Sequence, residues 1–255
     1  MAGSAEERRE KIIEIIRREG SVRVRELARL FDTSEVTIRA DLEMLEAGGH
    51  CRRNHGGAVG LDKLYIDMDI TERYMSNAAQ KKAIAEAICN IVEDNDTLFL
   101  NAGTTLTYVL RAIVGKKNIS IITNSITNAT EAASYQNMNV ILLGGQIDSK
   151  YQFTYGTDAV SQLKRYHAIK SILSLDGIDP VSGLTLYYAN EAELVRTMIE
   201  NSDTVIIAAD SSKLGRSTFV KVAPVTAADV IVTNKSEKNE LVSKLGLLGI
   251  EVIEV

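Results

Sequence analysis

From Ala78 onward, short apolar runs rich in β-branched residues alternate with stretches of helical periodicity. Most of these runs are continuously apolar, which is typical of strands buried on both faces of a parallel sheet. The repeated alternation of strand and helix favours an α/β fold with a doubly wound, mostly parallel sheet. The predicted strands are Thr97–Leu100, Ile119–Thr123, Val140–Leu143, Ala168–Leu175, Val205–Ala209, Val230–Val232 and Val252–Ile253. The predicted helices lie near residues 79–92, 105–114, 126–135, 157–166, 189–201 and 238–246.

Three helical segments precede this domain. Ala5–Arg18 places its isoleucines on one face of an amphipathic helix. A short helix around Leu27 follows, and Phe31–Thr33 forms a tight turn. Ser34 can cap the third helix, which Gly48 ends. This order is typical of a helix-turn-helix.

A short β-hairpin is predicted next, in the stretch HCRRNHGGAVG, because Arg52 and Arg53 are followed by a Gly-Gly turn and Val59. Such a hairpin is the wing of a winged helix-turn-helix. Residues 61–75 show no clear period, and we interpret them as a linker. The predicted organisation is a winged helix-turn-helix domain over residues 1–60, a linker over 61–75 and an α/β domain over 76–255.

The charge of the chain is unevenly distributed. Its net charge is -5, yet 10 of its 15 arginines lie in residues 1–60, where 11 acids and 11 basic residues cancel. The rest of the chain therefore carries the whole -5. This distribution excludes a protein that contacts nucleic acid over its whole surface, and it confines such a contact to the N-terminal domain.

Nothing in the sequence predicts secretion or insertion into a membrane. The start, MAGSAEERRE, is charged, and no apolar run approaches the roughly 18 residues of a membrane helix. Cys51 and Cys89 are too few for a disulfide framework and fit no zinc-binding spacing. We therefore expect a cytoplasmic protein with reduced thiols, no metal site and no cofactor.

The helix-turn-helix identifies candidate DNA contacts, because the start of its second helix enters the major groove. Arg39 suits a guanine edge or a phosphate, and the hydroxyls of Ser34 and Thr37 suit either kind of contact. The predicted DNA-binding residues are Arg23, Arg25, Ser34, Glu35, Thr37, Arg39, Arg52, Arg53 and His55. The alternative is a helical interaction module whose charges are merely solvated.

Glycine, hydroxyl, amide and charged residues follow five successive predicted strands. Ligands of open α/β sheets bind at the carboxyl ends of strands, and Thr104 and Thr105 open a helix whose free N–H groups attract an anion. The predicted effector-binding residues are Asn101, Gly103, Thr104, Thr105, Thr123, Asn124, Ser125, Gly144, Gly145, Asp176, Gly177, Glu191 and Lys213. The alternatives are helix capping, solvent exposure of the strand ends, and a structural salt bridge of Lys213 with Asp176 or Asp210.

These blocks carry a resemblance over nearly the full length of the chain. ERREKIIEII, TSEVTIRADLEMLE, HGGAV, NAGTT, ITNS, LLGG, DGID with GLT after it, EAE and ADSSK follow the order and spacing of the DeoR family of bacterial transcriptional regulators, which the chain resembles. The resemblance implies a winged helix-turn-helix that binds double-stranded operator DNA, an effector domain similar in fold to ribose-5-phosphate isomerase, and a homodimer or homotetramer. It further implies a repressor of sugar or polyol catabolism genes that a phosphorylated sugar controls.

The chain departs from the family pattern at two places. Asn101-Ala102 replaces Asp-Ser in the loop before Gly103, which removes a negative charge and a hydroxyl. A changed set of hydroxyl contacts with the effector, or weaker binding, follows as a hypothesis. Ala40 stands where the family often has a second basic residue, so one possible phosphate contact is missing.

A sugar-phosphate isomerase is the main alternative function. Its chemistry needs a well-placed base, and isomerases of the related fold carry a segment rich in Lys and Gly before an acid. Leu184–Glu191 has neither the Lys nor the glycines, and three scattered histidines offer no catalytic triad. We therefore predict a retained ligand site without catalysis. A scaffold protein, the second alternative, does not explain the polar strand ends.

Overall fold

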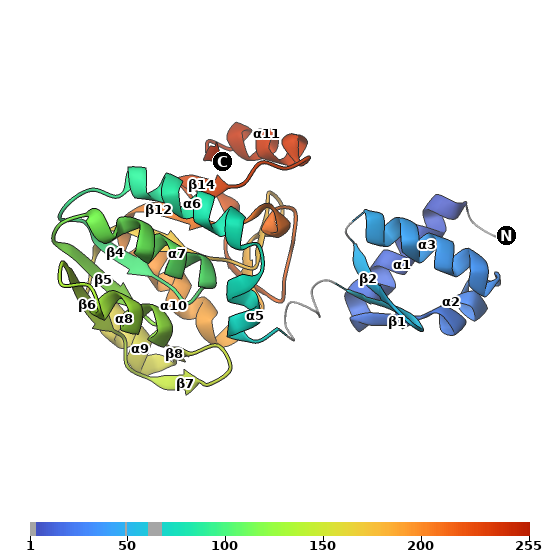
Figure 1. Cartoon of the computed structure of the whole chain (residues 1–255), viewed down its shortest axis with the longest axis horizontal. Helices are drawn as coiled ribbons and strands as arrows, with labels where there is room; N and C mark the ends of the chain where they lie inside the picture. Colours follow the sequence, from blue (N-terminus) through green and yellow to red (C-terminus); the bar gives the residue numbers. More distant parts are fainter. Residues whose placement is uncertain (1–3, 49, 61–67) are drawn as a thin grey trace. The chain divides into compact units, whose positions relative to one another are not determined.

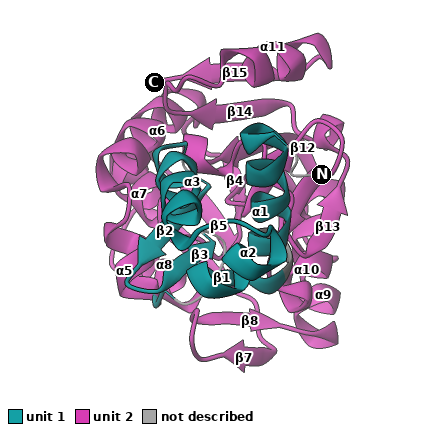
Figure 2. Cartoon of the chain, turned by 90° about the vertical axis from the view of Figure 1, so that its right-hand side faces the viewer, with its two compact units in different colours: residues 1–69 teal, residues 70–255 magenta. Residues whose placement is uncertain are grey.

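Residues 4–48, 50–60 and 68–255 are described by the structure, which is a computed structural model. The chain divides into an N-terminal unit, Met1–Asp69, and a C-terminal unit, Ile70–Val255 (Figure 2). None of the described helices is long and apolar enough to cross a membrane.

The N-terminal unit has the predicted helix-turn-helix and hairpin. Its elements are α1 (Ala5–Glu19), β1 (Ser21–Arg23), α2 (Val24–Leu30), α3 (Glu35–Ala47), β2 (Cys51–Asn54) and β3 (Gly57–Gly60). The strands form an antiparallel sheet in the order β1-β3-β2. β1 was not expected, because a three-residue strand leaves no readable period.

Local sequence explains where these elements begin and end. Ser4 and Glu7 form a capping box at the start of α1, and Gly20 ends that helix in the left-handed conformation. Gly57 allows β3 to pair closely with β1, since a Cβ atom there would lie 1.8 Å from the carbonyl oxygen of Val22. The second glycine of the HGGAV block is therefore a packing requirement of the wing.

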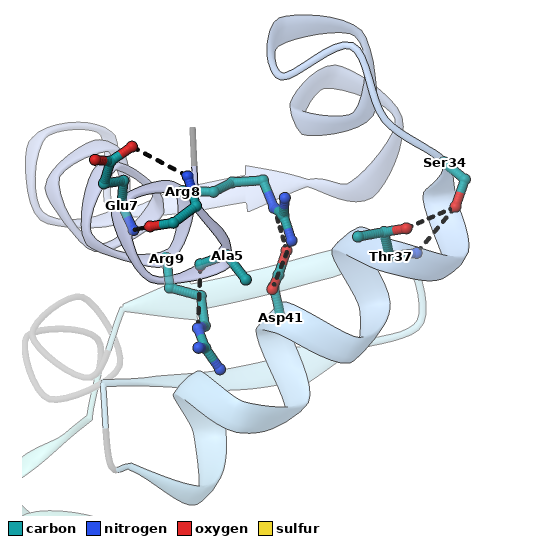
Figure 3. Close-up of polar contacts among 8 residues, drawn as sticks. Ala5, Glu7, Arg8, Arg9, Ser34, Thr37 and Asp41 are labelled. Atoms are coloured by element: carbon teal, nitrogen blue, oxygen red, sulfur yellow. Dashed lines mark hydrogen bonds and ion pairs between the residues drawn. The ribbon is translucent and has the colours of Figure 1, made fainter. Parts of the chain in front are cut away.

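An ion pair between Arg8 and Asp41 joins α1 to α3 (Figure 3). Arg8 Nε donates to Asp41 Oδ2 at 2.6 Å and Arg8 Nη2 donates to Oδ1 at 3.2 Å. The two side chains are only 16% and 7% exposed, so the carboxylate has little water to replace its partner. The contact fixes the turn of α3 that carries Asp41 against α1, beside an apolar core that includes Ile12, Ile38 and Leu42.

The C-terminal unit is built on a seven-stranded sheet in the order β15-β14-β12-β9-β4-β5-β6, with every neighbouring pair parallel. Its strands are β4 (Thr97–Leu100), β5 (Ile119–Thr123), β6 (Met138–Leu142), β9 (Ala168–Leu173), β12 (Ser202–Ala208), β14 (Val230–Thr233) and β15 (Glu251–Glu254). All the predicted strands are confirmed. Leu98 and Leu100 lie in one apolar core and Phe99 in the other, all fully buried, as a two-sided sheet requires.

Helices cover both faces of the sheet. Apolar residues of α6 (Ala78–Ile91), α7 (Thr104–Ala112) and α8 (Ile126–Ala133) lie in one core, and those of α9 (Thr157–Leu163), α10 (Ala189–Glu200) and α11 (Asn239–Leu247) lie in the other. Figure 1 shows the helices arranged around the sheet. From β4 the chain adds β5 and β6 in one direction, and from β9 it adds β12, β14 and β15 in the other. The order therefore reverses between β4 and β9, and such a switch point is where open α/β sheets bind ligands.

Several small elements were not predicted. They are the hairpin β7 (Gln146–Asp148) and β8 (Phe153–Tyr155), the sheet of β10 (Gly177–Asp179), β11 (Gly183–Leu186) and β13 (Val220–Ala223), and the 3₁₀ turns η1 (Ile113–Gly115), η2 (Ser211–Lys213) and η3 (Val225–Ala227).

One correction concerns the predicted linker over 61–75. Ile70–Met75 forms helix α5 and belongs to the C-terminal unit, whereas residues 61–67 lie outside the described residues. α5 has six residues and is held by specific side-chain contacts, so it shows no apolar period that a sequence could reveal.

Replacement of Arg8 by Met is expected to lower the free energy of unfolding of the N-terminal unit by roughly 2 kcal/mol, because the buried carboxylate of Asp41 loses its partner. Hydrogen–deuterium exchange of α3 amides in the full chain measures this loss. The Arg9→Met variant is the matched control, since within the described part of the chain Arg9 donates only to the Ala5 carbonyl of its own helix. Equal exchange in the two variants would show that the ion pair does not stabilise α3.

Candidate functional site

The start of α3 is organised by Ser34 and Thr37 (Figure 3). Ser34 Oγ accepts from the Thr37 backbone N–H at 3.1 Å and lies 2.9 Å from Thr37 Oγ1. Both residues were predicted to contact DNA, and the predicted capping of α3 by Ser34 is confirmed. Ala40, the departure from the family pattern, is exposed on the same helix.

Glu35 lies between two of the predicted DNA-binding arginines. Its Oε2 is 2.7 Å from Arg39 Nη2, and its Oε1 is 3.6 Å from Arg25 Nε. The three side chains are 39–83% exposed, so these ion pairs contribute little stability. Either arginine can exchange the carboxylate for a phosphate at small cost.

The wing presents its two arginines differently. Successive residues of a strand point to opposite faces, and Arg53 shares a face with buried Cys51. Arg53 Nη1 lies 3.6 Å from Glu43 Oε2 of α3, whereas Arg52 is exposed on the other face. Among the remaining predicted contacts, His55 is exposed at the turn, and exposed Arg23 lies 3.9 Å from Glu26.

In the C-terminal unit, three donors converge on one oxygen of Glu191. Glu191 Oε1 accepts from Asn101 Nδ2 at 3.2 Å, from the Ala102 backbone N–H at 3.1 Å and from Asn124 Nδ2 at 3.4 Å. Asn101 and Asn124 follow β4 and β5, and Glu191 lies in the first turn of α10. The structure therefore brings these three predicted residues together beside the switch point of the sheet.

Asn101 also bridges β4 and β9. Its Oδ1 accepts from the Ser174 backbone N–H at 2.8 Å, and its Nδ2 donates to the Ser174 carbonyl at 3.0 Å. An ionised Asp at this position could make neither this donation nor the one to Glu191. The replacement of Asp by Asn thus fits a site in which this side chain must donate to a neighbouring carboxylate.

Burial governs the charge of Glu191. Desolvation raises its pKa to about 7; the hydrogen bonds from Ala102, Asn124 and Asn101 lower it, and the charge of Asp176 raises it. Asp176 is itself buried, and its Oδ2 accepts from the Tyr187 backbone N–H at 3.0 Å. Glu191 consequently changes its charge near neutral pH.

Sequence analysis missed Lys81, a buried cation on α6. Lys81 Nζ donates to Thr104 Oγ1 at 3.1 Å and to the backbone carbonyl of Arg73. Burial lowers its pKa to about 8, an effect that Asp210 opposes and that Lys213 and Arg73 reinforce. The signal was present, because Lys81 shares helical spacing with buried Ile84 and Ile88.

Arg73 and two tyrosines were also missed. The guanidinium of Arg73 lies 4.3 Å from the ring centre of Tyr151, and its Nη2 donates to the Tyr188 hydroxyl at 3.1 Å. Arg73 is on α5, Tyr151 precedes β8 and Tyr188 precedes α10. Three segments distant in sequence are thereby joined, and no local pattern marks such a cluster.

Several other predicted effector residues have structural partners. Thr123 Oγ1 accepts from the Ser125 N–H at 3.0 Å, and Ser125 Oγ caps α8 by accepting from the Asn128 N–H at 3.1 Å. The Gly144 N–H donates to Gln162 Oε1 at 3.0 Å. These three positions therefore have partners within the chain, and their contact with an effector stays a prediction.

Three further glycines are required by close packing. A Cβ atom would lie 2.4 Å from the Tyr155 carbonyl oxygen at Gly145, 2.6 Å from the Arg216 carbonyl oxygen at Gly177 and 2.5 Å from Ser174 Cβ at Gly103. Thr105 and Lys213 are buried, and Lys213 influences the pKa of Lys81. Contact of these three glycines, Thr105 and Lys213 with an effector stays a prediction. Among the described residues, no group of three or more His, Cys, Asp or Glu side chains could hold a metal ion.

Replacement of Glu191 by Gln is expected to raise the stability of the chain relative to wild type, and to do so more at pH 8 than at pH 5. The folded-state pKa of Glu191 is raised above its ordinary value of 4.5, so its stabilising contribution is present below pH 4.5 and is lost as the pH rises through about 7. Gln cannot ionise. The free energy of unfolding of the variant minus that of wild type should therefore grow by roughly 3 kcal/mol over this range. Thermal unfolding at pH 5, 6, 7 and 8 measures it.

Glu193→Gln is the control, since Glu193 is exposed on the same helix. A pH-independent difference between Glu191→Gln and wild type would show that Glu191 does not titrate in this range.

Two family models match the chain. The DeoR-like helix-turn-helix domain matches residues 8–63, and the DeoR C terminal sensor domain matches residues 76–235.

Curated relatives are similar over most of the chain. An uncharacterized HTH-type transcriptional regulator, YulB of Bacillus subtilis, is 36% identical over 89% of this chain and 88% of its own. The putative aga operon transcriptional repressor of Escherichia coli O157:H7 is 31% identical over 98% of this chain and 93% of its own. The glycerol-3-phosphate regulon repressor of Escherichia coli K12 is 29% identical over 89% and 90%.

Solved structures similar to the chain include ribose 5-phosphate isomerase from Plasmodium falciparum. It is 22% identical, the match covers 54% of this chain and 52% of the isomerase, and the TM-score is 0.40.

Proposed function

The chain belongs to the DeoR family of transcriptional regulators, and we propose that it represses sugar or polyol catabolism genes under the control of a phosphorylated sugar. It is a DNA-binding regulator and not an isomerase, since its relatives are transcriptional regulators. A regulator of this kind acts on chromosomal DNA, so the cytoplasm is its proposed location. The observation that carries the effector proposal is the polar cluster at the switch point, where Glu191 meets Asn101 and Asn124.

The N-terminal unit supports binding to operator DNA through its exposed arginines. Arg25 and Arg39 are paired only weakly with Glu35, and Arg52 is exposed on the wing. We propose that Arg39 and the start of α3 contact base edges, and that Arg52 and the other predicted arginines contact phosphates. A homo-oligomer would present two such units to a palindromic operator.

The C-terminal unit supports binding of a ligand with an anionic end. Thr104 and Thr105 open α7, whose free N–H groups favour an anion. Lys81 donates to Thr104, and buried Lys213 lies near enough to influence the pKa of Lys81. We therefore place the phosphate of the effector at this end of α7.

Asn124 supports the proposal that the part of the ligand beyond the phosphate carries hydroxyl groups. Its Nδ2 donates to Glu191 Oε1 and to the Thr154 carbonyl, which fixes the orientation of the amide. Its buried Oδ1 has no hydrogen-bond partner among the described residues. A buried acceptor left unpaired costs about 1–3 kcal/mol, and a sugar hydroxyl that donates to it would recover that cost.

Arg39→Ala and Arg52→Ala are each expected to weaken DNA binding by about 5- to 30-fold and to reduce its salt dependence, since each removes a cationic contact. Fluorescence anisotropy with DNA upstream of the neighbouring genes, at several salt concentrations, measures both effects. Lys244→Ala, which removes the same charge from α11, should bind like wild type. Absence of any DNA binding by the wild type at low salt would refute the regulator proposal.

Lys213→Ala is expected to abolish the rise in Tm that a phosphorylated sugar produces, because the variant lacks a buried cation beside the proposed phosphate position. A thermal-shift panel of paired phosphorylated and free sugars measures the rise and identifies the effector. Lys235→Ala removes an exposed lysine of the same unit and serves as the control. An undiminished shift in Lys213→Ala would place the phosphate elsewhere.

A further inference from the structure

Helix α5 begins the C-terminal unit at Ile70, directly after the N-terminal unit ends at Asp69. It lies where the chain enters the C-terminal unit (Figure 1). A helix of six residues is not stable by itself, so its contacts with the rest of the unit hold it in place. A change in those contacts acts on the segment through which the two units are covalently joined.

The backbone of α5 is fastened to α6 and α7. The Arg73 carbonyl oxygen accepts from Lys81 Nζ and from Thr104 Oγ1, the latter at 3.4 Å. The Tyr74 carbonyl oxygen accepts from the Tyr108 hydroxyl at 3.2 Å, and the two tyrosine rings are stacked with centroids 4.8 Å apart. Thr104 and Tyr108 are one turn apart on α7, so the proposed phosphate-binding helix is also the helix that holds α5.

The side chain of Arg73 reaches a second segment near the proposed effector site, the residue that precedes α10. Its guanidinium donates to the hydroxyl of Tyr188, the residue immediately before α10, and Glu191 lies in the first turn of that helix. α5 therefore contacts the start of α7, where the phosphate is proposed to bind, and the residue that precedes the helix carrying the buried carboxylate.

Lys81 is the residue whose bonding an anion would change most. Its ammonium group has three N–H donors, and two of them go to neutral acceptors, the Arg73 carbonyl and the Thr104 hydroxyl. An anion that accepts from two N–H groups of Lys81 would therefore displace one of these acceptors. Lys81 forms no ion pair with any described residue. Both bonds are already charge-assisted, because their donor is the ammonium of Lys81, but neither acceptor carries a charge. An anion beside Thr104 would add direct attraction between opposite charges, which is stronger at a buried site than in water, so it competes well against the peptide carbonyl.

We propose that Lys81 binds the anionic group of the effector and, in turning to it, releases the Arg73 carbonyl and loosens α5. This inference rests on the proposed function, since it assumes an anionic effector at the start of α7. It adds a binding residue to that site and identifies α5 as the strap that transmits occupancy toward the DNA-binding unit. By linkage, a chain whose strap is already loose binds the effector more tightly.

Hydrogen–deuterium exchange of α5 in the full chain tests the strap. The probes are inorganic phosphate, glycerol 3-phosphate, ribose 5-phosphate and fructose 6-phosphate, each with its unphosphorylated counterpart where one exists. A probe that binds should speed exchange of the α5 amides by about tenfold, because a loosened strap opens more often. The unphosphorylated compounds should leave α5 unchanged.

Two variants separate the parts of the proposal. Lys81→Met removes both the strap bond and the anion contact, so α5 should exchange fast without ligand and the Kd of the probe should rise about tenfold. Tyr108→Phe removes only a strap bond, to the Tyr74 carbonyl. It should speed α5 exchange, lower the Kd of the probe about threefold, and shift DNA affinity in the same direction as saturating probe.

Lys82→Met is the matched control, since Lys82 is exposed beside Lys81 and, among the described residues, pairs only with Glu86. If a probe binds the wild type but leaves α5 exchange unchanged, or binds Lys81→Met equally well, the inference is wrong while the proposed function stands. If no probe binds the wild type, the proposed effector class is wrong and the inference falls with it. Loss of DNA binding in the wild type would instead refute the regulator proposal.

Discussion

Glu191 is buried, and the surrounding structure depends on how its carboxylate is satisfied. Its Oε1 draws donors from the loops after β4 and β5, while its own backbone begins α10. An ionised group in such a position is tolerated only when donors replace the lost water. The ends of two strands and the start of one helix are therefore fixed relative to one another by a single side chain, at the point where the order of the sheet reverses.

The loops around Glu191 also bear on how the proposed effector would bind. The same loops that satisfy Glu191 leave Asn124 Oδ1 without a partner among the described residues, so the site offers a ready acceptor. Asn101, which donates where the family pattern has an acid, is committed to Ser174 and Glu191 on both ends of its amide. The loss of a charge there is thus compensated within the site.

The sequence predicted the elements that burial alone determines. Each strand of the large sheet contains an apolar run such as Leu98–Leu100, and the helix-turn-helix follows from helical periodicity with a capping Ser34. Elements held by distant side chains could not be predicted, because α5 depends on Arg73 meeting Tyr151 and Tyr188 from other parts of the chain. Lys81 was only partly predictable. Its helical spacing with Ile84 and Ile88 indicates a buried position, but a lysine on a helix usually faces solvent. Gly145 and Gly177 were predicted to approach a ligand, whereas close backbone packing already accounts for them.

Glu35 also bears on the thermodynamics of any complex with DNA. A cationic side chain that meets a phosphate releases a counterion from the duplex, and this release entropy favours association. Arg25 and Arg39 share one carboxylate that would stay beside the phosphates, where it would retain a cation that would otherwise leave. The number of ions set free should therefore be smaller than the number of arginines in contact. A unit of this design gives up some indiscriminate attraction for nucleic acid, and more of its affinity must come from geometric fit to a particular site.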